Sequence, residues 1–262
     1  METQIPQRTG RRLPKRPKAG PFRILYSVGL IAICGLVTVS LIAVAAICAP
    51  LDSKGRIHQG LFRFWARAIL RICRVRVDVV GTASVDTQRN YVVVSNHASL
   101  VDAVILIAHL PVPVRFLSKD DLFRIPIIGT YMRTTGHIPI RRGNARSTLR
   151  SLREAATVLR SSQMSILVFP EGTRSDSGLL DFKDGAALLA IQSQLPVLPV
   201  GLIGTHLIAP PRSFLLYSGY SILNIGLPLE SNAFPSIDCR QALTSVLHSE
   251  VARLCCPTSD RS

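Results

Sequence analysis

A histidine and an aspartate follow an apolar run in the segment YVVVSNHASLVDAV, residues 91–104. His97 falls in the turn after a predicted strand, and Asp102 falls in the first turn of the helix predicted to follow. A carboxylate placed there can accept a hydrogen bond from one imidazole nitrogen, which fixes the tautomer and leaves the other nitrogen available as a general base. The same spacing also fits a helix cap, because Ser99 followed three residues later by Asp102 is a capping-box pattern. This segment alone leaves both interpretations open.

Four small or polar residues end a second apolar run, in SILVFPEGTRS, residues 165–175. They are Glu171, Gly172, Thr173 and Arg174. The glycine allows a tight turn with exposed backbone amides, and the arginine carries a planar guanidinium fork suited to phosphate. A capping turn would explain the glycine and the threonine, but it gives no reason for the glutamate and the arginine beside them.

Short apolar runs alternate with helical patterns from residue 75 onward. Strands that alternate with helices are typical of α/β proteins, so residues 75–256 are expected to form one α/β domain with a mixed, largely parallel sheet flanked by helices. The predicted strands are 75–80, 91–95, 114–118, 137–140, 165–169, 197–203 and 222–226. The predicted helices are 99–110, 145–162, 183–194 and 238–254.

Two more predicted strands end in cationic residues. The strand in TTGHIPIRRG ends in Arg141 and Arg142, and the strand in RFLSKDDL ends in Lys119. Ligands of parallel α/β sheets gather at the carboxyl ends of the strands. We therefore expect these cations to join His97 and Arg174 in one pocket that holds a base and several positive charges.

The charge balance indicates a polyanionic partner. The 262-residue chain carries 31 Lys and Arg against 16 Asp and Glu, a formal net charge of +15. A hydrophobic fraction of 47% and a mean hydropathy of +0.30 favour lipid over nucleic acid, and aromatic residues at 6% are too few for base-stacking platforms. The six cysteines show no C-x-x-C spacing and the histidines are scattered, so neither a metal site nor another cofactor is expected.

The N-terminal quarter is predicted to bind a membrane. Residues 1–23 form a Pro-rich arm with seven basic residues and are expected to be disordered. Residues 24–51 contain no charged residue and would reach about 40 Å as a helix at about 1.5 Å per residue, longer than a hydrocarbon core of about 30 Å. This segment is expected to be either one tilted transmembrane span or a re-entrant pair bent at its glycines.

Residues 52–74 follow with a clear helical period in the stretch GLFRFWARAILRICR. A polar face that is all arginine fits an amphipathic helix lying in an anionic membrane interface, and packing on the domain is the alternative. The apolar face comprises Leu61, Phe64, Trp65, Ala68, Ile69 and Ile72, and the opposite face comprises Arg63, Arg67, Arg71 and Arg74.

Four blocks of this sequence resemble the motif blocks of the glycerolipid acyltransferases, in particular the bacterial 1-acyl-glycerol-3-phosphate acyltransferases. The blocks are NHASLVD, GHIPIRR, FPEGTRS and LPVLPVGL, in the family's order and at its approximate spacing, between about residues 75 and 230. The resemblance implies a membrane enzyme, expected at a bacterial inner membrane with its active site facing the cytoplasm. Its partners would be membrane lipids, with no nucleic acid among them.

The resemblance also implies a role for each matching residue. His97 resembles the family's general base and Asp102 its orienting carboxylate. Residues 171–174 match the block associated with acceptor binding, and Gly136 and Arg142 match the block whose arginine is associated with the acceptor phosphate. Three departures concern the identity of the acceptor: Leu100, Pro139 and Arg141 stand where tryptophan, phenylalanine and aspartate are common.

The implied reaction moves an acyl group from acyl-CoA or acyl-carrier protein to the free hydroxyl of a lysophospholipid, expected to be 1-acyl-glycerol-3-phosphate. An alcohol is a poor nucleophile at neutral pH, so His97 would remove its proton while Asp102 stabilises the imidazolium. No enzyme nucleophile is needed, and the G-x-S-x-G elbow of serine hydrolases is absent. Backbone amides around Gly172 would stabilise the oxyanion. The alternatives are another acceptor, such as a lyso-ornithine lipid, and a catalytically inactive, membrane-tethered lipid-binding protein.

Overall fold

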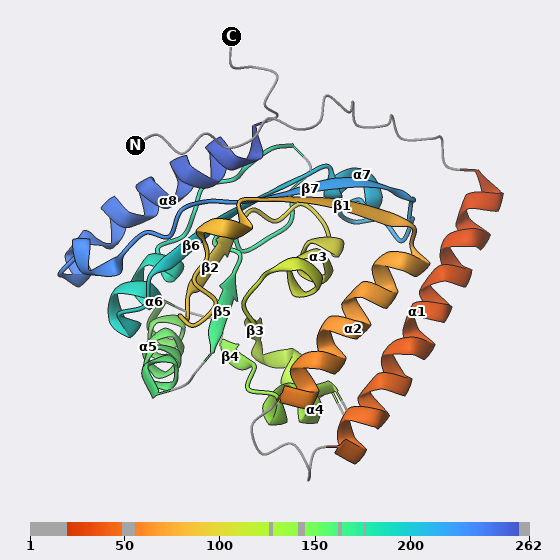
Figure 1. The fold of residues 1–262 in the computed structure, drawn as a ribbon, viewed down its shortest axis with the longest axis horizontal. Coiled ribbons are helices and arrows are strands. Elements are labelled where there is room, and N and C mark those ends of the chain that lie inside the picture. Colours follow the sequence, from red (N-terminus) through yellow and green to blue (C-terminus); the bar gives the residue numbers. More distant parts are fainter. Residues whose placement is uncertain are drawn as a thin grey trace.

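A computed structural model describes residues 20–48, 56–125, 128–140, 145–161, 164–175 and 177–256 (Figure 1). Most of the basic arm and the predicted cations Arg141 and Arg142 lie outside these ranges. The strands are β1 (Val75–Val80), β2 (Val92–Ser95), β3 (Val114–Lys119), β4 (Ile138–Ile140), β5 (Ser165–Val168), β6 (Val197–Ile203) and β7 (Gly219–Ile225). The helices are α1 (Pro21–Cys48), α2 (Arg56–Ile72), α3 (Val101–His109), α4 (Ile128–Thr134), α5 (Ala145–Ser161), α6 (Gly185–Ser193), α7 (Thr205–Ile208) and α8 (Arg240–Cys255).

All the described strands belong to one mixed sheet in the order β1-β7-β6-β2-β5-β3-β4. Five neighbouring strands, from β6 to β4, run parallel to one another, whereas β7 pairs antiparallel with β6. β1 is parallel to β7, so these two strands run opposite to the other five. The predicted α/β fold with a largely parallel sheet is therefore confirmed, and β2 lies near its centre.

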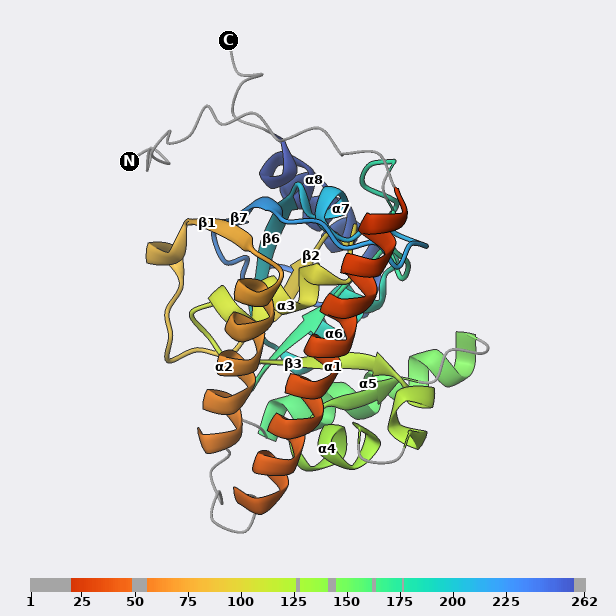
Figure 2. The same ribbon diagram turned by 90° about the vertical axis from the view of Figure 1, so that its right-hand side faces the viewer.

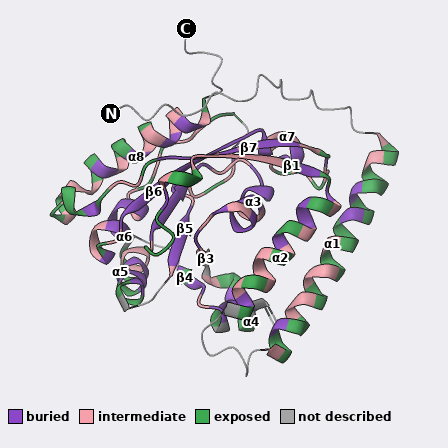
Figure 3. Cartoon of the chain, in the orientation of Figure 1, coloured by how far each residue is buried: buried purple, intermediate pink, exposed green. Residues whose placement is uncertain are grey.

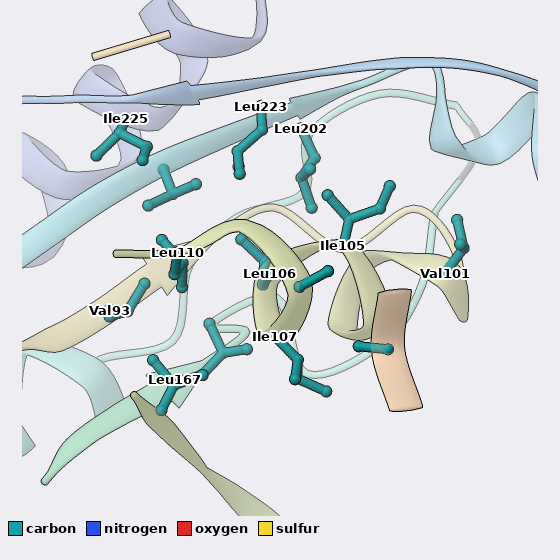
Figure 4. Close-up of a cluster of buried hydrophobic side chains, with 14 of the residues drawn as sticks. Val93, Val101, Ile105, Leu106, Ile107, Leu110, Leu167, Leu202, Leu223 and Ile225 are labelled. Carbon is teal, nitrogen blue, oxygen red and sulfur yellow. The ribbon is translucent and has the colours of Figure 1, made fainter. Parts of the chain in front are cut away.

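Helices cover both faces of the sheet and bury two apolar layers (Figure 1). Because side chains of a strand alternate between faces, Val93 points into the layer under α2 and α3, while Val92 and Val94 point into the layer under α5, α6 and α8. Figure 4 shows the first layer, where Ile105 and Leu106 of α3 lie against side chains of the sheet. Both faces of β2 are fully buried, which explains its unbroken run of valines.

The helices and strands predicted from residue 75 onward are confirmed to within three residues at each end. The missed helices, α4 and α7, have seven and four residues. Elements this short carry too few turns for an apolar period to stand out in the sequence.

α1 is one unbroken helix of 28 residues, so the re-entrant pair is not observed. Among the described residues it is the helix that is long and apolar enough to cross a membrane, and little of it is buried (Figure 3). The helix nevertheless lies along the domain, because Ser27 near its start accepts a hydrogen bond from Leu216 and its other end approaches α4 (Figure 2). Thr38, at mid-helix, accepts a hydrogen bond from the Trp65 indole of α2 at 2.9 Å.

α2 lies between α1 and α3, and this position divides its arginine face (Figure 1). Arg63 donates to the Leu110 carbonyl at 2.8 Å and Arg67 donates to the Ala108 carbonyl at 3.3 Å, so both satisfy carbonyl groups at the end of α3. Arg71 and Arg74 are exposed. Packing on the domain therefore accounts for two of the four arginines.

The contact between α1 and the domain can be tested through two native cysteines. Cys34 of α1 and Cys73, which follows α2, place their sulfur atoms 3.9 Å apart. Burial raises the pKa of the Cys73 thiol to about 12, so spontaneous oxidation by air should be slow. Copper–phenanthroline, which accepts the two electrons as two protons leave, should join the pair in the membrane-bound protein. Peptide mass spectrometry should find the Cys34–Cys73 link and no link from Cys73 to Cys48, whereas absence of the link would contradict the docking of α1.

Candidate active site

His97 and Asp102 form a direct hydrogen bond at the carboxyl end of β2. His97 Nδ1 lies 2.8 Å from Asp102 Oδ2. The same carboxylate oxygen accepts from the backbone amides of Ala98 and Ser99, both at 2.7 Å, and the carboxylate is fully buried. Asp102 thus holds the turn before α3 and also contacts the imidazole, whereas the N-cap of α3 is Leu100, without a side-chain cap bond. The other ring nitrogen, Nε2, has no partner among the described residues.

The segment after β5 holds the backbone of His97 from both sides. The His97 amide donates to Glu171 Oε1 at 2.6 Å, and the Ser175 amide donates to the His97 carbonyl at 3.0 Å. Phe169 stacks on the imidazole with a centroid distance of 4.0 Å and an interplanar angle of 16°. The histidine is therefore fixed in position by its main chain, its ring face and Nδ1 together.

Glu171 is a structural support of this turn. Its second oxygen, Oε2, accepts from the Leu180 amide at 3.0 Å, and the residue is 4% exposed. Burial raises the pKa of the Glu171 carboxyl above its usual value, although the two backbone donors oppose this rise. With both oxygens occupied by main-chain donors, Glu171 has no oxygen directed at a ligand in the way that its place in the acceptor block implied.

Asn96 connects the same turn to the neighbouring strand. Its side-chain amide donates to the Leu202 carbonyl at 2.9 Å, and its side-chain oxygen accepts from the Leu202 amide at 2.8 Å. This pair of bonds continues the β2–β6 ladder for one step after β2 has ended. The polar residue that ends the valine run is therefore a structural pairing residue.

A cavity of about 1160 Å³ opens at the carboxyl ends of the parallel strands, with His97 in its wall. Its apolar lining comes from strand ends and from α5 and α6, and includes Leu117, Ile140, Leu152 and Leu188. Among the described residues, the lining includes the positively charged Arg153, Arg174, Lys183 and Arg240 and the carboxylate of Asp184. A cavity of this volume, mostly apolar with a few charged groups, suits an amphiphilic anion.

The structure brings some of the predicted residues together. Gly172, Thr173 and Arg174 line the cavity with His97, and Gly172 has the left-handed φ of 72° that its turn requires. Gly136 does not join them, because it precedes β4 at the opposite edge of the sheet, where its φ of 80° serves the turn after α4.

Two predicted cations, Lys119 and Arg142, lie partly or wholly outside the described residues. The backbone of Lys119 ends β3 on the site's edge of the sheet, but its side chain lies outside the described atoms, as does all of Arg142.

Sequence reasoning missed Phe169 and Lys183. Phe169 was assigned to the end of a strand, and only its stacking on His97 identifies it as a support. Lys183 was assigned to the start of a helix; its backbone amide donates to the Pro170 carbonyl at 3.0 Å, and its ammonium lies over Gly172, 2.9 Å from the point where a Cβ would stand. The local signal was the FKDG sequence before an apolar helix, which resembles an ordinary helix start.

The described residues include no group of three or more His, Cys, Asp or Glu side chains that could hold a metal ion. His137, which directly precedes β4, is buried between Phe62 and Phe116, and its Nδ1 accepts from the Phe116 amide at 3.1 Å. Burial, with the nearby Arg115, lowers the pKa of His137 to about 3, so it is neutral and structural.

The geometry of this site can be compared with known proteins. A family model described as Acyltransferase matches residues 76–203, the span that contains His97, Asp102 and the 171–175 turn. A 1-acyl-sn-glycerol-3-phosphate acyltransferase of Limnanthes alba is 32% identical over 194 residues, which cover 72% of this chain and 69% of that protein. The chain belongs to the 1-acyl-sn-glycerol-3-phosphate acyltransferase family.

Further relatives extend the similarity beyond sequence motifs. The human 1-acyl-sn-glycerol-3-phosphate acyltransferase beta is 29% identical over 161 residues, covering 60% of this chain and 58% of that protein. The crystal structure of the 1-acyl-sn-glycerophosphate acyltransferase PlsC from Thermotoga maritima matches with a TM-score of 0.75 at 25% identity, covering 88% of this chain and 95% of that one. The shared fold therefore extends beyond the segment that the family model matches.

The supporting role of Glu171 predicts a specific kinetic defect. In Glu171→Gln, the new NH₂ group would face the amide of either His97 or Leu180, and neither can accept a hydrogen bond. Displacement of the histidine should lower kcat by about tenfold to a hundredfold. The KM values for donor and acceptor should change little, because Glu171 does not line the cavity.

Steady-state kinetics and thermal unfolding would check this prediction. Asp181→Asn is the matched control, because Asp181 is an exposed carboxylate of the same segment that does not line the cavity, and the variant should keep the wild-type kcat and melting temperature. A Glu171→Gln enzyme with an unchanged kcat and a raised acceptor KM would instead indicate direct contact between Glu171 and the acceptor.

Proposed function

We propose that this protein transfers an acyl group to the free hydroxyl of 1-acyl-sn-glycerol-3-phosphate and so forms phosphatidate. The observation that carries the proposal is the His97–Asp102 pair in the wall of a cationic, mostly apolar cavity. Membership of the family supports the choice of acceptor, since the named relatives are 1-acyl-sn-glycerol-3-phosphate acyltransferases. The donor would be acyl-CoA or acyl-carrier protein.

His97 would act as the general base. Asp102 accepts at Nδ1, so the proton of the neutral ring resides there and Nε2 presents a lone pair. Nε2 would take the proton of the acceptor hydroxyl as its oxygen attacks the thioester carbonyl. The imidazolium formed in this step is stabilised by the buried Asp102 carboxylate, and it can then protonate the leaving thiolate.

Two backbone amides are the best candidates for stabilising the oxyanion. The Gly172 amide already donates to the Phe169 carbonyl at 3.1 Å, so it is not available for this purpose. The amides of Thr173 and Arg174 have no acceptor among the described residues, and both residues line the cavity. They would stabilise the tetrahedral intermediate from the turn that also holds His97.

Arg174 and Lys183 would bind the phosphate of the acceptor. Both line the cavity beside the Gly172 turn, and no carboxylate lies within 4.0 Å of either among the described residues. A guanidinium fork and an ammonium group together suit a phosphate monoester. A lyso-ornithine lipid, which presents a carboxylate and an amine, remains the alternative acceptor, and an inactive lipid-binding protein remains the alternative of a different class.

The position of α1 supports attachment to one face of a membrane. α1 contacts the domain from Ser27 to its far end, so a bilayer that it crossed would also have to contain the polar domain. We place α1 in the plane of the membrane interface, with its exposed apolar residues towards lipid and the domain in water. A bacterial inner membrane with the site on the cytoplasmic side is the proposed location.

Replacement of His97 tests the proposed chemistry. Because His97 is partly exposed at a strand end, His97→Gln should keep the melting temperature close to that of the wild type. Loss of the base should lower the rate of phosphatidate formation by about 10²–10⁴-fold, measured with labelled lysophosphatidate and acyl-CoA or acyl-carrier protein. His137→Gln is unsuited as a control because His137 is buried, so His206→Gln, at a half-buried position, serves instead. A His97→Gln enzyme within a few-fold of wild type would refute the general-base role.

The phosphate-binding role of Arg174 and Lys183 predicts a defect confined to the acceptor. Each charge-assisted hydrogen bond is worth about 1.5–3 kcal/mol, so Arg174→Ala or Lys183→Met should raise the KM for lysophosphatidate by roughly tenfold to a hundredfold. The donor KM should stay constant, and monoacylglycerol, which lacks the phosphate, should show no such change.

Competition between lysophosphatidate and lyso-ornithine lipid in the wild-type enzyme decides the acceptor, and faster acylation of the ornithine lipid would overturn this assignment.

A further inference from the structure

The loop between α7 and β7 carries an exposed aromatic residue, Phe214, at its tip. Phe214 is 87% exposed, the same fraction as Phe22 at the start of α1. The sequence of the loop, APPRSFLLY, combines two prolines with aromatic and aliphatic residues and has no acidic residue. Exposed apolar residues indicate an interaction surface where they lie together with others, so the neighbours of Phe214 decide its meaning.

This loop has a defined conformation that presents Phe214. Its base is closed by the Tyr217 amide, which donates to the Ile208 carbonyl at 2.8 Å. Ser213 supports the tip, since its hydroxyl accepts from the Leu215 amide at 3.1 Å, and Arg212 has a φ of 58°. Prolines and local hydrogen bonds limit the freedom of the chain, so little conformational entropy is left to lose when the tip is buried.

The loop is physically continuous with the exposed apolar helix α1 (Figure 2). Ser27 accepts a hydrogen bond from the Leu216 amide at 3.0 Å. The Arg23 guanidinium lies over the rings of Tyr217 and Tyr26, at 4.8 and 5.5 Å from their centroids. Tyrosines and arginines are typical of the level where lipid headgroups meet acyl chains. The contact therefore places the tip of the loop at the edge of the surface that α1 presents to lipid.

The same loop begins beside the catalytic turn. The Ser99 hydroxyl donates to the Ala209 carbonyl at 2.7 Å, two residues from His97. Leu100, the next residue, is 63% exposed. Exposed apolar side chains thus occur at the start of α1, at the tip of the loop and at Leu100, next to the turn that carries His97.

We propose that the Ala209–Tyr217 loop is a second membrane-contact element, in which Phe214 inserts into the acyl-chain region while Arg212 and Arg23 meet anionic headgroups. One helix lying in an interface leaves the domain free to rotate about the helix axis. A second contact beside His97 removes that freedom and turns the catalytic turn towards the membrane, from which a lipid acceptor must come. This proposal rests on the proposed membrane attachment through α1.

A tryptophan placed at the tip of the loop tests the insertion directly. The chain has one tryptophan, so Trp65→Phe combined with Phe214→Trp gives a single probe in the full-length protein. Vesicles of phosphatidylcholine and anionic phosphatidylglycerol, with bromine atoms on their acyl chains, quench fluorophores that lie within the bilayer. The emission of this tip probe should shift to the blue and be quenched, most strongly by bromines about 5–10 Å below the headgroups.

Leu227→Trp in the same Trp65→Phe background is the matched control. Leu227 is 64% exposed and follows β7 at the end opposite the loop, roughly 20 Å away at about 3.3 Å per residue of strand. The emission of this control probe should stay at long wavelength and resist quenching. The proposal is overturned if the tip probe behaves like the control probe on protein that floats with the vesicles and still forms phosphatidate. It is also overturned if the tip probe is shielded only at high protein concentration, by a second copy of the chain.

A second pair of variants keeps the native Trp65 and its hydrogen bond. Phe214→Ser should weaken loop insertion by about tenfold or more, since this is the factor associated with burying a phenylalanine side chain. Phosphatidate formation from vesicle-borne long-chain lysophosphatidate should fall, while the rate with a water-soluble short-chain acceptor should not; Leu227→Ser should change neither rate. Equal rates for Phe214→Ser and wild type on vesicles would count against the loop, whereas absence of vesicle binding or of acyl transfer in the wild type would count against the proposed function itself.

Discussion

The backbone of His97 is the point on which the site depends. His97 follows β2 at the carboxyl end of the parallel strands. The segment after β5 bonds to the His97 amide through Glu171 and to the His97 carbonyl through Ser175. A histidine in an unsupported turn would sample several positions, and a base misplaced by about an ångström loses much of its effect. Here, the segments that follow two neighbouring parallel strands meet at His97, so its backbone cannot shift without breaking the contacts made by the segment after β5.

This arrangement concentrates negative charge behind the imidazole. Asp102 and Glu171 are both buried, and each accepts at least two hydrogen bonds from protein donors, nearly all from backbone amides. Buried carboxylates are stable only where such donors compensate their lost hydration. The amide donors come from the turn after β2, at residues 97–99, and from Leu180 in the segment after β5. When the ring gains a proton, the charge that forms is next to carboxylates that are already in place.

The sequence was sufficient to predict the strands and the sheet type, because these depend on local patterns, and it placed His97 and Asp102 close enough to form a hydrogen bond. Val92–Ser95 and Ser165–Val168 are short apolar runs with polar ends, and the five-residue spacing of His97 and Asp102 spans one turn. The role of Glu171 was not predictable from its neighbours, since its partner His97 lies 74 residues away. The partners of Arg63 and Arg67 were not predictable for the same reason: these carbonyl groups at the end of α3 lie more than 40 residues further along the chain. A pattern shows which face of a helix is charged, but it does not show what that face meets.

The tautomer of His97 is the most direct measure of the central claim. We expect ¹⁵N NMR of the lipid-bound enzyme, labelled at its six histidines and assigned with His97→Gln, to show a neutral His97 ring with its proton on Nδ1, because Asp102 accepts there and Nε2 must carry the lone pair. His137 is an internal reference: its Nδ1 accepts from the Phe116 amide, so its proton should be on Nε2. Opposite tautomers at His97 and His137 would support a general base held by Asp102. A neutral His97 protonated on Nε2 would contradict it, because that ring could not take a proton from an acceptor hydroxyl in the cavity.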